Sequence, residues 1–267
     1  MSAPSIQSHS RQIHPTAVIA SGAQVGNGCV IGPFAIIGDN VVLGDGVRVD
    51  GHCVIDGRTM IGDETHLFPF VSIGLPPQDL KFAGEETETE IGSRNRIREF
   101  VTIHRGTKGG GGLTKIGDDC FIMAQAHIAH DCLIGDHVIM ANAATLAGHV
   151  IVDDGANIGA YSGVHQFCRV GREAYIGGYS VVVKDALPFA LTVGNHAKCY
   201  GLNKVGMRRR GYARETIAAM HHAFHLLLSS KLNTTQAIER IRKEIKNTPE
   251  VDELVQFVES SQRGVVK

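Results

Sequence analysis

The sequence predicts a mainly β protein, a parallel β-helix followed by a C-terminal α-helical domain. The first observation is an aliphatic residue that recurs every six positions, often with a small residue at the fifth place of the hexad. The second is the glycine content, 32 of 267 residues, and the third is a tail from Arg214 in which apolar residues follow a helical spacing. A short repeat sustained over this length is typical of solenoids, whose units bury a continuous core only by stacking on their neighbours.

The hexads begin at Ile13 and run without a break to Ile73, resume from Ile91 to Ile103, and continue from Ile116 to Val182. If three hexads make one triangular coil, residues three hexads apart lie above one another at strand spacing, ~4.8 Å. The aliphatic residues then stack inward, which removes apolar area from water at about 25 cal/mol per Å². Glycine after many of them permits the turn conformations that corners require.

Two segments interrupt the hexads, and we expect both to form loops. Residues 75–90 read LPPQDLKFAGEETETE, and we expect a whole coil's worth of chain to leave the wall there. Loops on a rigid scaffold often carry function, so Asp79 and Lys81 are candidate substrate contacts, although ordinary loop charges explain them equally well. Residues 108–115 read KGGGGLTK, which lacks the order and the strand-loop-helix context of a phosphate-binding loop and predicts a flexible flap.

The tail predicts three helices beyond the end of the solenoid near Pro188. One starts at Arg214, one at Asn233, and one at Thr248, where Thr suits the N-cap and Pro the first turn. We therefore expect a β-helix domain over residues 1–190 and a helical domain over 191–267. His221 and His225 have a spacing that metals use, but without a third ligand nearby they are expected on the surface. The basic run at 207–210 suits either phosphate binding or a solvated link.

Composition excludes several classes of function. The formal net charge of −1 gives no global basic field for nucleic acid or anionic membrane. No apolar run approaches the ~18 residues of a membrane span, and the N-terminus lacks the features of a signal peptide, so we expect a cytoplasmic protein. Disulfides are improbable there, and the cysteines at the fifth place of a hexad are expected to be small packing residues: Cys29, Cys53, Cys120, Cys132 and Cys168.

The stretch from His127 to His149 gathers candidate catalytic residues at one corner. With three hexads per coil, His130 falls under Gly148, and Asp131 falls under His149. An imidazole base, a carboxylate that orients it and a glycine N–H that faces an oxyanion are what acyl transfer needs. The alternative is that corners of a β-helix simply favour polar residues and glycine.

An ordered set of motifs resembles the UDP-N-acetylglucosamine O-acyltransferase family over nearly the whole chain. The motifs are IREFVTIHRGT (97–107), AHIAHDC (126–132), LAGHV (146–150), VHQFC (164–168), GNHA (194–197) and MRRRG (207–211). The resemblance implies a left-handed β-helix and a homotrimer with active sites between subunits. It also implies transfer of an R-3-hydroxyacyl chain from acyl carrier protein to the 3-hydroxyl of UDP-N-acetylglucosamine, the first step of lipid A biosynthesis in Gram-negative bacteria. No metal or cofactor is implied.

The resemblance also assigns roles to residues of this chain. His130 is similar to the family's general base, Asp131 to the carboxylate that orients it, and the backbone N–H of Gly148 to the oxyanion donor. Gly178 matches the position that gauges acyl length, and a glycine there implies a long, hydroxymyristoyl-like chain, although Tyr175 and Tyr179 flank it. The remaining substrate-binding matches are Gln78, Asp79, Lys81, His127 and His149 for the sugar and diphosphate, His165 and Gln166 near the acyl and nucleotide site, His196 on the acyl groove, and Asn203, Arg209 and Arg210 for the nucleotide. Val205 replaces a glutamate of the family pattern.

Three other functions fit a hexapeptide solenoid. A sister N-acyltransferase would carry an additional N-terminal uridine-binding domain, for which hexads beginning at Ile13 leave no room. A zinc hydratase would draw three histidines from adjacent subunits, such as His104, His127 and His149, and they would have to converge on one ion at ~2.0–2.1 Å. A non-catalytic binding solenoid would tolerate the loss of His130 without functional consequence.

Overall fold

The computed structural model describes residues 10–267. Most of the N-terminal segment, for which the sequence predicts no signal peptide, lies outside the described residues. The chain divides into two compact units, residues 1–137 and 138–267, which are described separately. This division falls inside the hexad repeat, and the domain boundary expected at residue 190 stays a prediction. Within residues 10–267 the longest apolar helices are too short to cross a membrane.

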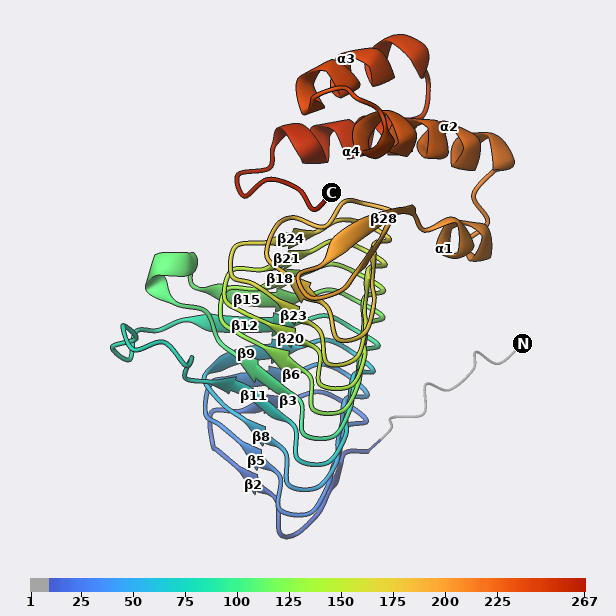
Figure 1. The fold of residues 1–267 in the computed structure, drawn as a ribbon. Helices are drawn as coiled ribbons and strands as arrows, with labels where there is room; N and C mark the ends of the chain where they lie inside the picture. The colour runs from blue at the N-terminus through green and yellow to red at the C-terminus, as the bar shows by residue number, and fades with distance from the viewer. Residues whose placement is uncertain (1–9) are drawn as a thin grey trace, which may run out of the picture. The chain divides into compact units, whose positions relative to one another are not determined.

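The first unit is a left-handed parallel β-helix with three sheets as its walls (Figure 1). Its strands stack in the orders β1-β4-β7-β10-β13-β16, β2-β5-β8-β11-β14-β17 and β3-β6-β9-β12-β15-β18. Val18 pairs with Ile36 and Ile19 with Ile37, which confirms that one coil takes three hexads. The strands are β1 (Gln12–Ile13), β2 (Val18–Ile19), β3 (Gln24–Val25), β4 (Val30–Ile31), β5 (Ile36–Ile37), β6 (Val41–Leu43), β7 (Arg48–Val49), β8 (Val54–Ile55), β9 (Arg58–Ile61), β10 (His66–Leu67), β11 (Ser72–Leu75), β12 (Glu88–Ile91), β13 (Arg96–Ile97), β14 (Thr102–His104), β15 (Leu113–Ile116), β16 (Phe121–Ile122), β17 (His127–Ile128) and β18 (Leu133–Ile134).

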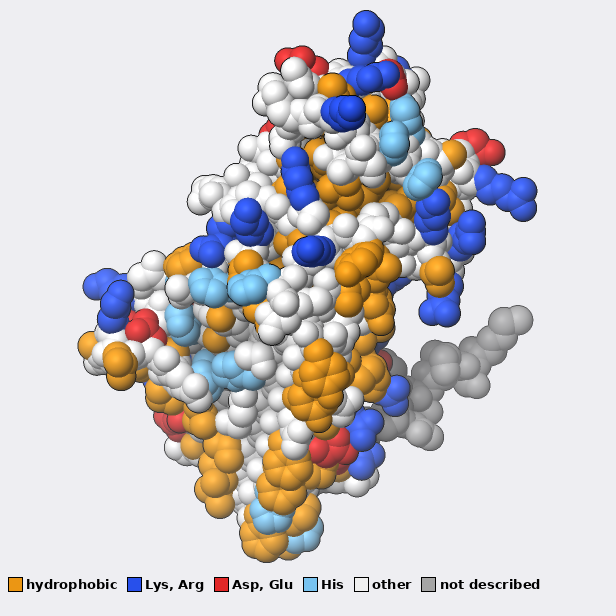
Figure 2. Space-filling view, in the orientation of Figure 1, with side chains coloured by type: hydrophobic (Ala, Val, Ile, Leu, Met, Phe, Trp, Pro, Cys, Tyr) orange, Lys and Arg blue, Asp and Glu red, His pale blue; other side chains and the backbone are white. Residues whose placement is uncertain are grey.

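The hexad residues form the core as predicted. Aliphatic openers such as Ile55, Leu67 and Ile97 are fully buried, and the five cysteines at the fifth place are buried beside them. Outside, Phe34, His52, Phe70 and Phe100 stack in a column with ring centroids 5.1, 4.9 and 5.0 Å apart. Figure 2 shows exposed hydrophobic side chains with histidines beside them over the first strands.

The glycines that follow the openers serve a different purpose from the one expected. The left-handed corner positions are held mostly by other residues, including Phe34, His52 and Asp131, with φ near 60°. A Cβ added to Gly26 would lie only 2.3 Å from the carbonyl oxygen of Gly44 in the next coil. Glycine is needed there because the backbones of successive coils approach closely, not because the turn requires its conformational freedom.

The two interruptions are shorter than the sequence suggests. Ile61 pairs with Ile91, 30 positions along the chain instead of 18, so 12 residues leave the wall and not a whole coil. The strands β11 and β12 include both ends of the expected loop, which leaves residues 76–87 outside them. Ile97 pairs with Ile122, 25 positions along, so the second insertion adds seven residues. It contains the short helix η1 (Lys108–Gly110) and ends at β15.

The second unit contains parallel coils of its own and ends them by reversing the chain. Its strands stack in the orders β19-β22-β25-β27-β28, β20-β23-β26 and β21-β24. The coils reach a little beyond Pro188, because β27 still pairs in parallel with β25, and β28 then returns antiparallel to β27. The strands are β19 (Ile139–Met140), β20 (Thr145–Leu146), β21 (Ile151–Val152), β22 (Asn157–Ile158), β23 (Gly163–Val164), β24 (Arg169–Val170), β25 (Tyr175–Ile176), β26 (Val181–Val182), β27 (Ala190–Val193) and β28 (Lys198–Leu202).

The three predicted helices are present, and the structure adds a short one before them. The helices are α1 (Lys204–Arg209), α2 (Arg214–Phe224), η2 (His225–Ser229, a π-helical end to α2), α3 (Thr234–Glu244) and α4 (Pro249–Glu259). Asn233 and Gln236 form a capping box at the start of α3. Thr248 is the N-cap of α4 as expected, but its side chain makes no capping hydrogen bond. His221 and His225 are exposed on this unit, as the sequence predicts.

Candidate active site

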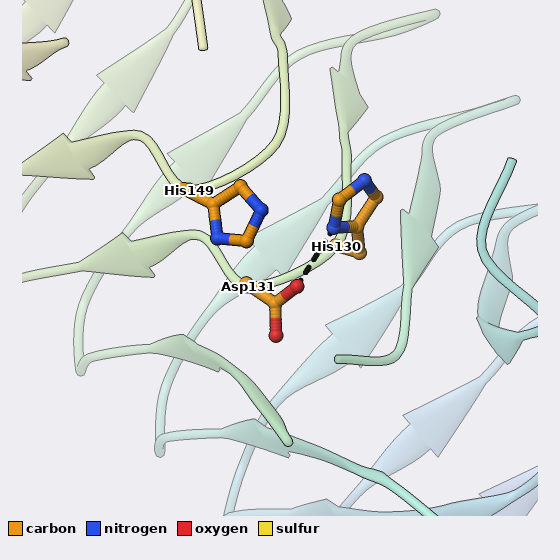
Figure 3. Close-up of side chains that lie close together, drawn as sticks. All are labelled: His130, Asp131 and His149. Carbon is orange, nitrogen blue, oxygen red and sulfur yellow. Dashed lines mark hydrogen bonds and ion pairs between the residues drawn. The ribbon is translucent and has the colours of Figure 1, made fainter. Parts of the chain in front are cut away.

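His130 and Asp131 form a hydrogen-bonded pair at the corner that follows β17. Nδ1 of His130 lies 2.7 Å from Oδ2 of Asp131, and Figure 3 marks this contact with a dashed line. Asp131 adopts a left-handed φ of 59°, the corner conformation of this fold. Its side chain is fully buried, whereas that of His130 is 16% exposed. A carboxylate can only accept, so Nδ1 carries the proton and Nε2 offers a lone pair.

Asp131 receives further donors from the segment that precedes the flap. The backbone N–H of Thr107 donates to Oδ1 at 2.8 Å, and the Thr107 hydroxyl donates to Oδ2 at 2.7 Å. The backbone N–H of Asp131 itself donates to the Thr114 hydroxyl at 2.8 Å. A buried carboxylate is stable only when donors replace the water it has lost, and these bonds do so.

Two more histidines lie beside this pair in the first unit. The rings of His104 and His127 meet edge to face with centroids 5.0 Å apart, and Nδ1 of His127 is 2.7 Å from the Thr102 hydroxyl. Burial, followed by the charges of His127 and His130, lowers the pKa of His104 to about 4. Burial and His130 also lower the pKa of His127. Both rings are therefore neutral at pH 7 and can donate or accept hydrogen bonds without adding charge.

The zinc alternative for His104 and His127 stays a prediction, because its three histidines would come from adjacent subunits. Among residues 10–267, neither ring belongs to a group of three ligand-type side chains whose donor atoms lie close enough to share one ion. His127 also engages Thr102 through Nδ1.

The candidate contacts in the first loop lie on its surface. Gln78 and Lys81 are exposed, and Asp79 is half-buried. The carboxylate of Asp79 accepts the backbone N–H of Lys81 at 3.0 Å, which tightens this part of the loop into a turn. Leu80, between them, is fully exposed. The loop thus presents one apolar and several polar side chains outward.

Gly148 and His149, which belong to the second unit, follow β20. His149 has a left-handed φ of 61°, and its ring stacks on Phe167 with centroids 4.4 Å apart. In the described part of the chain, the backbone N–H of Gly148 donates to no acceptor. His165 and Gln166 are exposed at the next corner, where Nδ1 of His165 lies 3.2 Å from the Gln166 carbonyl oxygen.

The residues matched to the nucleotide gather at one hollow of the second unit. A cavity of about 490 Å³ is lined by Asn203, Arg209 and Arg210, with Tyr175 and Val205 among the other residues. Asn203 caps α1 by accepting the N–H of Gly206 at 3.0 Å, so its side chain amide is held in place. Arg210 pairs with Glu173 at 3.0 Å, and this carboxylate offsets part of the positive charge in the hollow.

Gly178 and His196 lie elsewhere on the second unit. A Cβ added to Gly178 would approach the Ala160 carbonyl oxygen at 3.3 Å, so a larger residue would fit with only a small shift. Tyr179 is 71% exposed and stacks on Tyr161 at 5.1 Å. His196 is exposed and lines a hollow with Val183 and Lys184, among others.

The sequence did not single out Thr107, which donates to both oxygens of the Asp131 carboxylate, or Thr114, whose hydroxyl accepts from the Asp131 backbone N–H. Thr107 ends the IHRGT motif, directly before the glycine run, but nothing in the hexad pattern places it against Asp131. Arg169 and Arg172 each form an ion pair inside the second unit. Arg169 binds Asp185 at 3.0 Å, and Arg172 binds Glu253.

Comparison with known proteins identifies the class and then the family. Residues 113–148 match the family model for bacterial transferase hexapeptide (six repeats), so the fold and its repeat are those of the hexapeptide-repeat transferases. Residues 185–266 match the model for domain 2 of UDP N-acetylglucosamine O-acyltransferase. An acyl-[acyl-carrier-protein]–UDP-N-acetylglucosamine O-acyltransferase of Myxococcus xanthus (strain DK1622) is 50% identical over 256 residues, which are 96% of this chain and 99% of that protein.

Solved structures agree with this assignment. The UDP-N-acetylglucosamine acyltransferase of Bacteroides fragilis is 40% identical with a TM-score of 0.94, covering 96% of this chain and 100% of that one. The enzyme of Francisella novicida is 35% identical with a TM-score of 0.93, covering 96% and 94%. The chain belongs to the UDP-N-acetylglucosamine O-acyltransferase family and is an acyltransferase, as its motifs predict.

Proposed function

We propose that this protein transfers an R-3-hydroxyacyl chain from acyl carrier protein to the 3-hydroxyl of UDP-N-acetylglucosamine, the first step of lipid A biosynthesis. The observation that carries the proposal is the 2.7 Å hydrogen bond between His130 and the fully buried Asp131. The Myxococcus xanthus relative is named for acyl carrier protein and this nucleotide sugar, and half of its residues are identical. We expect the reaction to take place in the cytoplasm.

His130 acts as the general base. Because Asp131 accepts from Nδ1, Nε2 is free of its proton and takes the proton of the sugar 3-hydroxyl. The sugar oxygen then attacks the thioester carbonyl carbon, and the carbonyl oxygen becomes an oxyanion. When this intermediate collapses, the carbon–sulfur bond breaks, and the imidazolium of His130 returns the proton to the departing thiolate. The thioester is already activated, so neither a covalent acyl-enzyme nor a cofactor is required.

The backbone N–H of Gly148 is the proposed oxyanion donor. Its support is that, in the described residues, this N–H donates to no acceptor, so it is available to an incoming group. Donors fixed in place before the reaction stabilise the developing charge without reorganisation. Other corner N–H groups share this property, so the assignment depends on the family match as well.

Substrate contacts follow from the family match and from the chemistry of the side chains. Asn203, Arg209 and Arg210 line one hollow, and guanidinium groups bind phosphate oxygens bidentately, which suits the nucleotide. Gln78, Asp79, Lys81, His127 and His149 are proposed for the sugar and diphosphate, and His165, Gln166 and His196 for the acyl side. The family match at Gly178, where a glycine adds no side chain to the acyl groove, supports a long, hydroxymyristoyl-like chain. We further propose a homotrimer whose active sites lie between subunits.

The first experiment measures acyl transfer from carrier protein loaded with short, medium and long 3-hydroxyacyl chains to UDP-N-acetylglucosamine, with the product identified by mass. We expect transfer of a long chain and little transfer to UDP-glucose, which carries a hydroxyl where the acceptor has its N-acetyl group. Transfer of a short chain in preference would contradict the role of Gly178. Absence of transfer from every chain would contradict the proposed function, and zinc analysis of the purified protein would then test the hydratase alternative.

A further inference from the structure

We propose that Thr107 and Gly110 of the second insertion are positioning residues for the reaction, because together they fix and cover the Asp131 carboxylate that orients His130. The inference rests on the proposed function for its kinetic consequences. The contacts that motivate it all lie within the first unit. Neither residue belongs to a hexad, because both lie in the second insertion, which is outside the sheets of the β-helix.

Thr107 directs its hydroxyl to Asp131 rather than to the helix it begins. It is the N-cap residue of η1, yet its side chain makes no capping hydrogen bond. A threonine at this position ordinarily caps the helix with its hydroxyl. Here the hydroxyl donates to Oδ2 of Asp131 and the backbone N–H donates to Oδ1, so one buried residue holds both carboxylate oxygens. Two donors from one residue fix the plane of the carboxylate as well as its position.

Gly110 covers the same carboxylate from the flap. A Cβ added to Gly110 would lie 2.1 Å from Cγ of Asp131, closer than any real contact. Its φ lies outside the left-handed region, so glycine is required here for space alone. Around Gly109, which is in the same helical turn, an added Cβ would meet nothing within 4 Å. The flap therefore needs a glycine at 110, where it lies over Asp131, and not at 109.

The flap is itself fixed to the β-helix wall. The N–H groups of Gly110 and Gly112 donate to the Thr107 carbonyl oxygen at 3.0 and 2.8 Å. Glu88 of β12 donates to the Gly112 carbonyl at 2.8 Å and accepts from the Gly106 N–H at 3.1 Å. These bonds tie the segment to the wall next to Asp131, and the flexibility that the glycine run suggests stays a prediction.

The consequence for His130 follows from the shared oxygen. Oδ2 of Asp131 accepts from both the Thr107 hydroxyl and Nδ1 of His130. If the hydroxyl is removed, His130 is the remaining donor of the two to Oδ2, and the unshared negative charge favours the imidazolium form. The carboxylate also loses one of the bonds that prevent its rotation. The first effect leaves less of His130 in the unprotonated form that can take a proton, and the second misaligns its ring; neither touches the substrate.

The test uses Thr107→Val and Thr107→Ser, paired with Gly110→Ala and Gly109→Ala. For Thr107→Val we expect kcat to fall about 10-fold to 100-fold, the range of a hydrogen bond to a charged group. The KM for UDP-N-acetylglucosamine should stay within about twofold, because the lost contact is made equally with and without substrate. Thr107→Ser, which keeps the hydroxyl, should restore kcat. For Gly110→Ala we expect a loss of about 100-fold, as a displaced catalytic group produces, while Gly109→Ala should behave as wild type.

A second measurement needs no substrate. The rate at which diethyl pyrocarbonate modifies His130, followed by peptide mass spectrometry across pH, reports when its imidazole loses a proton. We expect the midpoint to move to higher pH in Thr107→Val and to stay at the wild-type value in Thr107→Ser. An unchanged midpoint in Thr107→Val, or equal losses in Gly109→Ala and Gly110→Ala, would overturn the inference. If the wild-type protein transfers no acyl chain, the proposed function is contradicted, but the inference about Thr107 is not. The pH midpoint of His130 modification, compared between wild type and Thr107→Val, still tests that inference.

Discussion

Among the described residues of the first unit, two histidine–aspartate pairs have hydrogen bonds of almost the same length. His130 and Asp131 are joined at 2.7 Å, and His66 and Asp50 at 2.8 Å. The Asp50 side chain is 21% exposed, and its other oxygen binds Arg48 at 2.9 Å. The Asp131 side chain is fully buried, and uncharged donors of Thr107 hold it.

The difference shows that distance alone does not define a catalytic pair. Asp50 shares its charge with a cation and with water, so His66 is one of several partners of a surface carboxylate. Asp131 is screened from water and held by uncharged donors of Thr107, so its charge acts strongly on the ring beside it. The pairs also use different ring nitrogens, Nε2 in His66 and Nδ1 in His130. In the proposed mechanism, the second arrangement lets Nε2 of His130, the outer nitrogen of the ring, take the proton.

The largest expected effect separates the two histidines. His130→Ala should lower kcat about 1,000-fold, within the range that a positioned general base contributes, while His66→Ala should retain activity within about twofold. Steady-state acyl-transfer rates of both variants, with the fold checked by circular dichroism, test this. Comparable losses in the two variants would mean that His130 has no special role in proton transfer.

A smaller effect separates the two aspartates. Asp131→Asn keeps the shape of the side chain but can place an amide donor against the His130 ring, which favours the tautomer whose Nε2 is protonated and cannot act as a base. We expect kcat to fall about 100-fold at constant protein stability. Asp50→Asn changes a solvent-exposed ion pair of little energetic value and should leave kcat near that of wild type. A full-rate Asp131→Asn would show that the carboxylate does not set the tautomer.

The hexad predicted the scaffold of this comparison but not its decisive contacts. Because the period of six repeats strictly, it fixed which residues face the core, where the coils stop and that His130 adjoins Asp131 at a corner. The same pattern predicts nothing about the contacts of residues that lie outside the coils. Thr107 and Gly110 act on Asp131 from a seven-residue insertion, and an insertion obeys no period that a single sequence reveals.

The roles of glycine illustrate the same limit. A glycine is easily recognised in a sequence, but the structural reason that requires it at that position is not. Gly26 is required by the backbone of the next coil, and Gly110 by a carboxylate 21 positions further along the chain. Neither reason is the conformational freedom that a turn-rich sequence suggests, and only the spatial neighbours distinguish them. Composition alone therefore does not reveal why a glycine is needed at a given position.

The smallest expected effect concerns His104, which flanks the pair and is neutral for a physical reason that can be tested. Burial and neighbouring histidines hold its pKa at about 4 in the folded protein, against about 6.5 in the unfolded chain. Between these values the unfolded chain binds more protons, so the free energy of unfolding decreases as the pH falls from about 6.5 to about 4. Full protonation of this one site would cost at most about 3 kcal/mol.

His104→Gln removes that titration while keeping a polar side chain of similar length. Its free energy of unfolding, measured with urea at a fixed protein concentration, should fall less steeply than that of wild type between pH 6.5 and pH 4. Some pH dependence should remain, because the pKa of His127 is also lowered by burial. Parallel curves for the two proteins would mean that His104 is protonated in the fold as readily as in the unfolded chain. His104 would then carry charge next to His130, and the neutral surroundings that distinguish this pair from His66 and Asp50 would not exist.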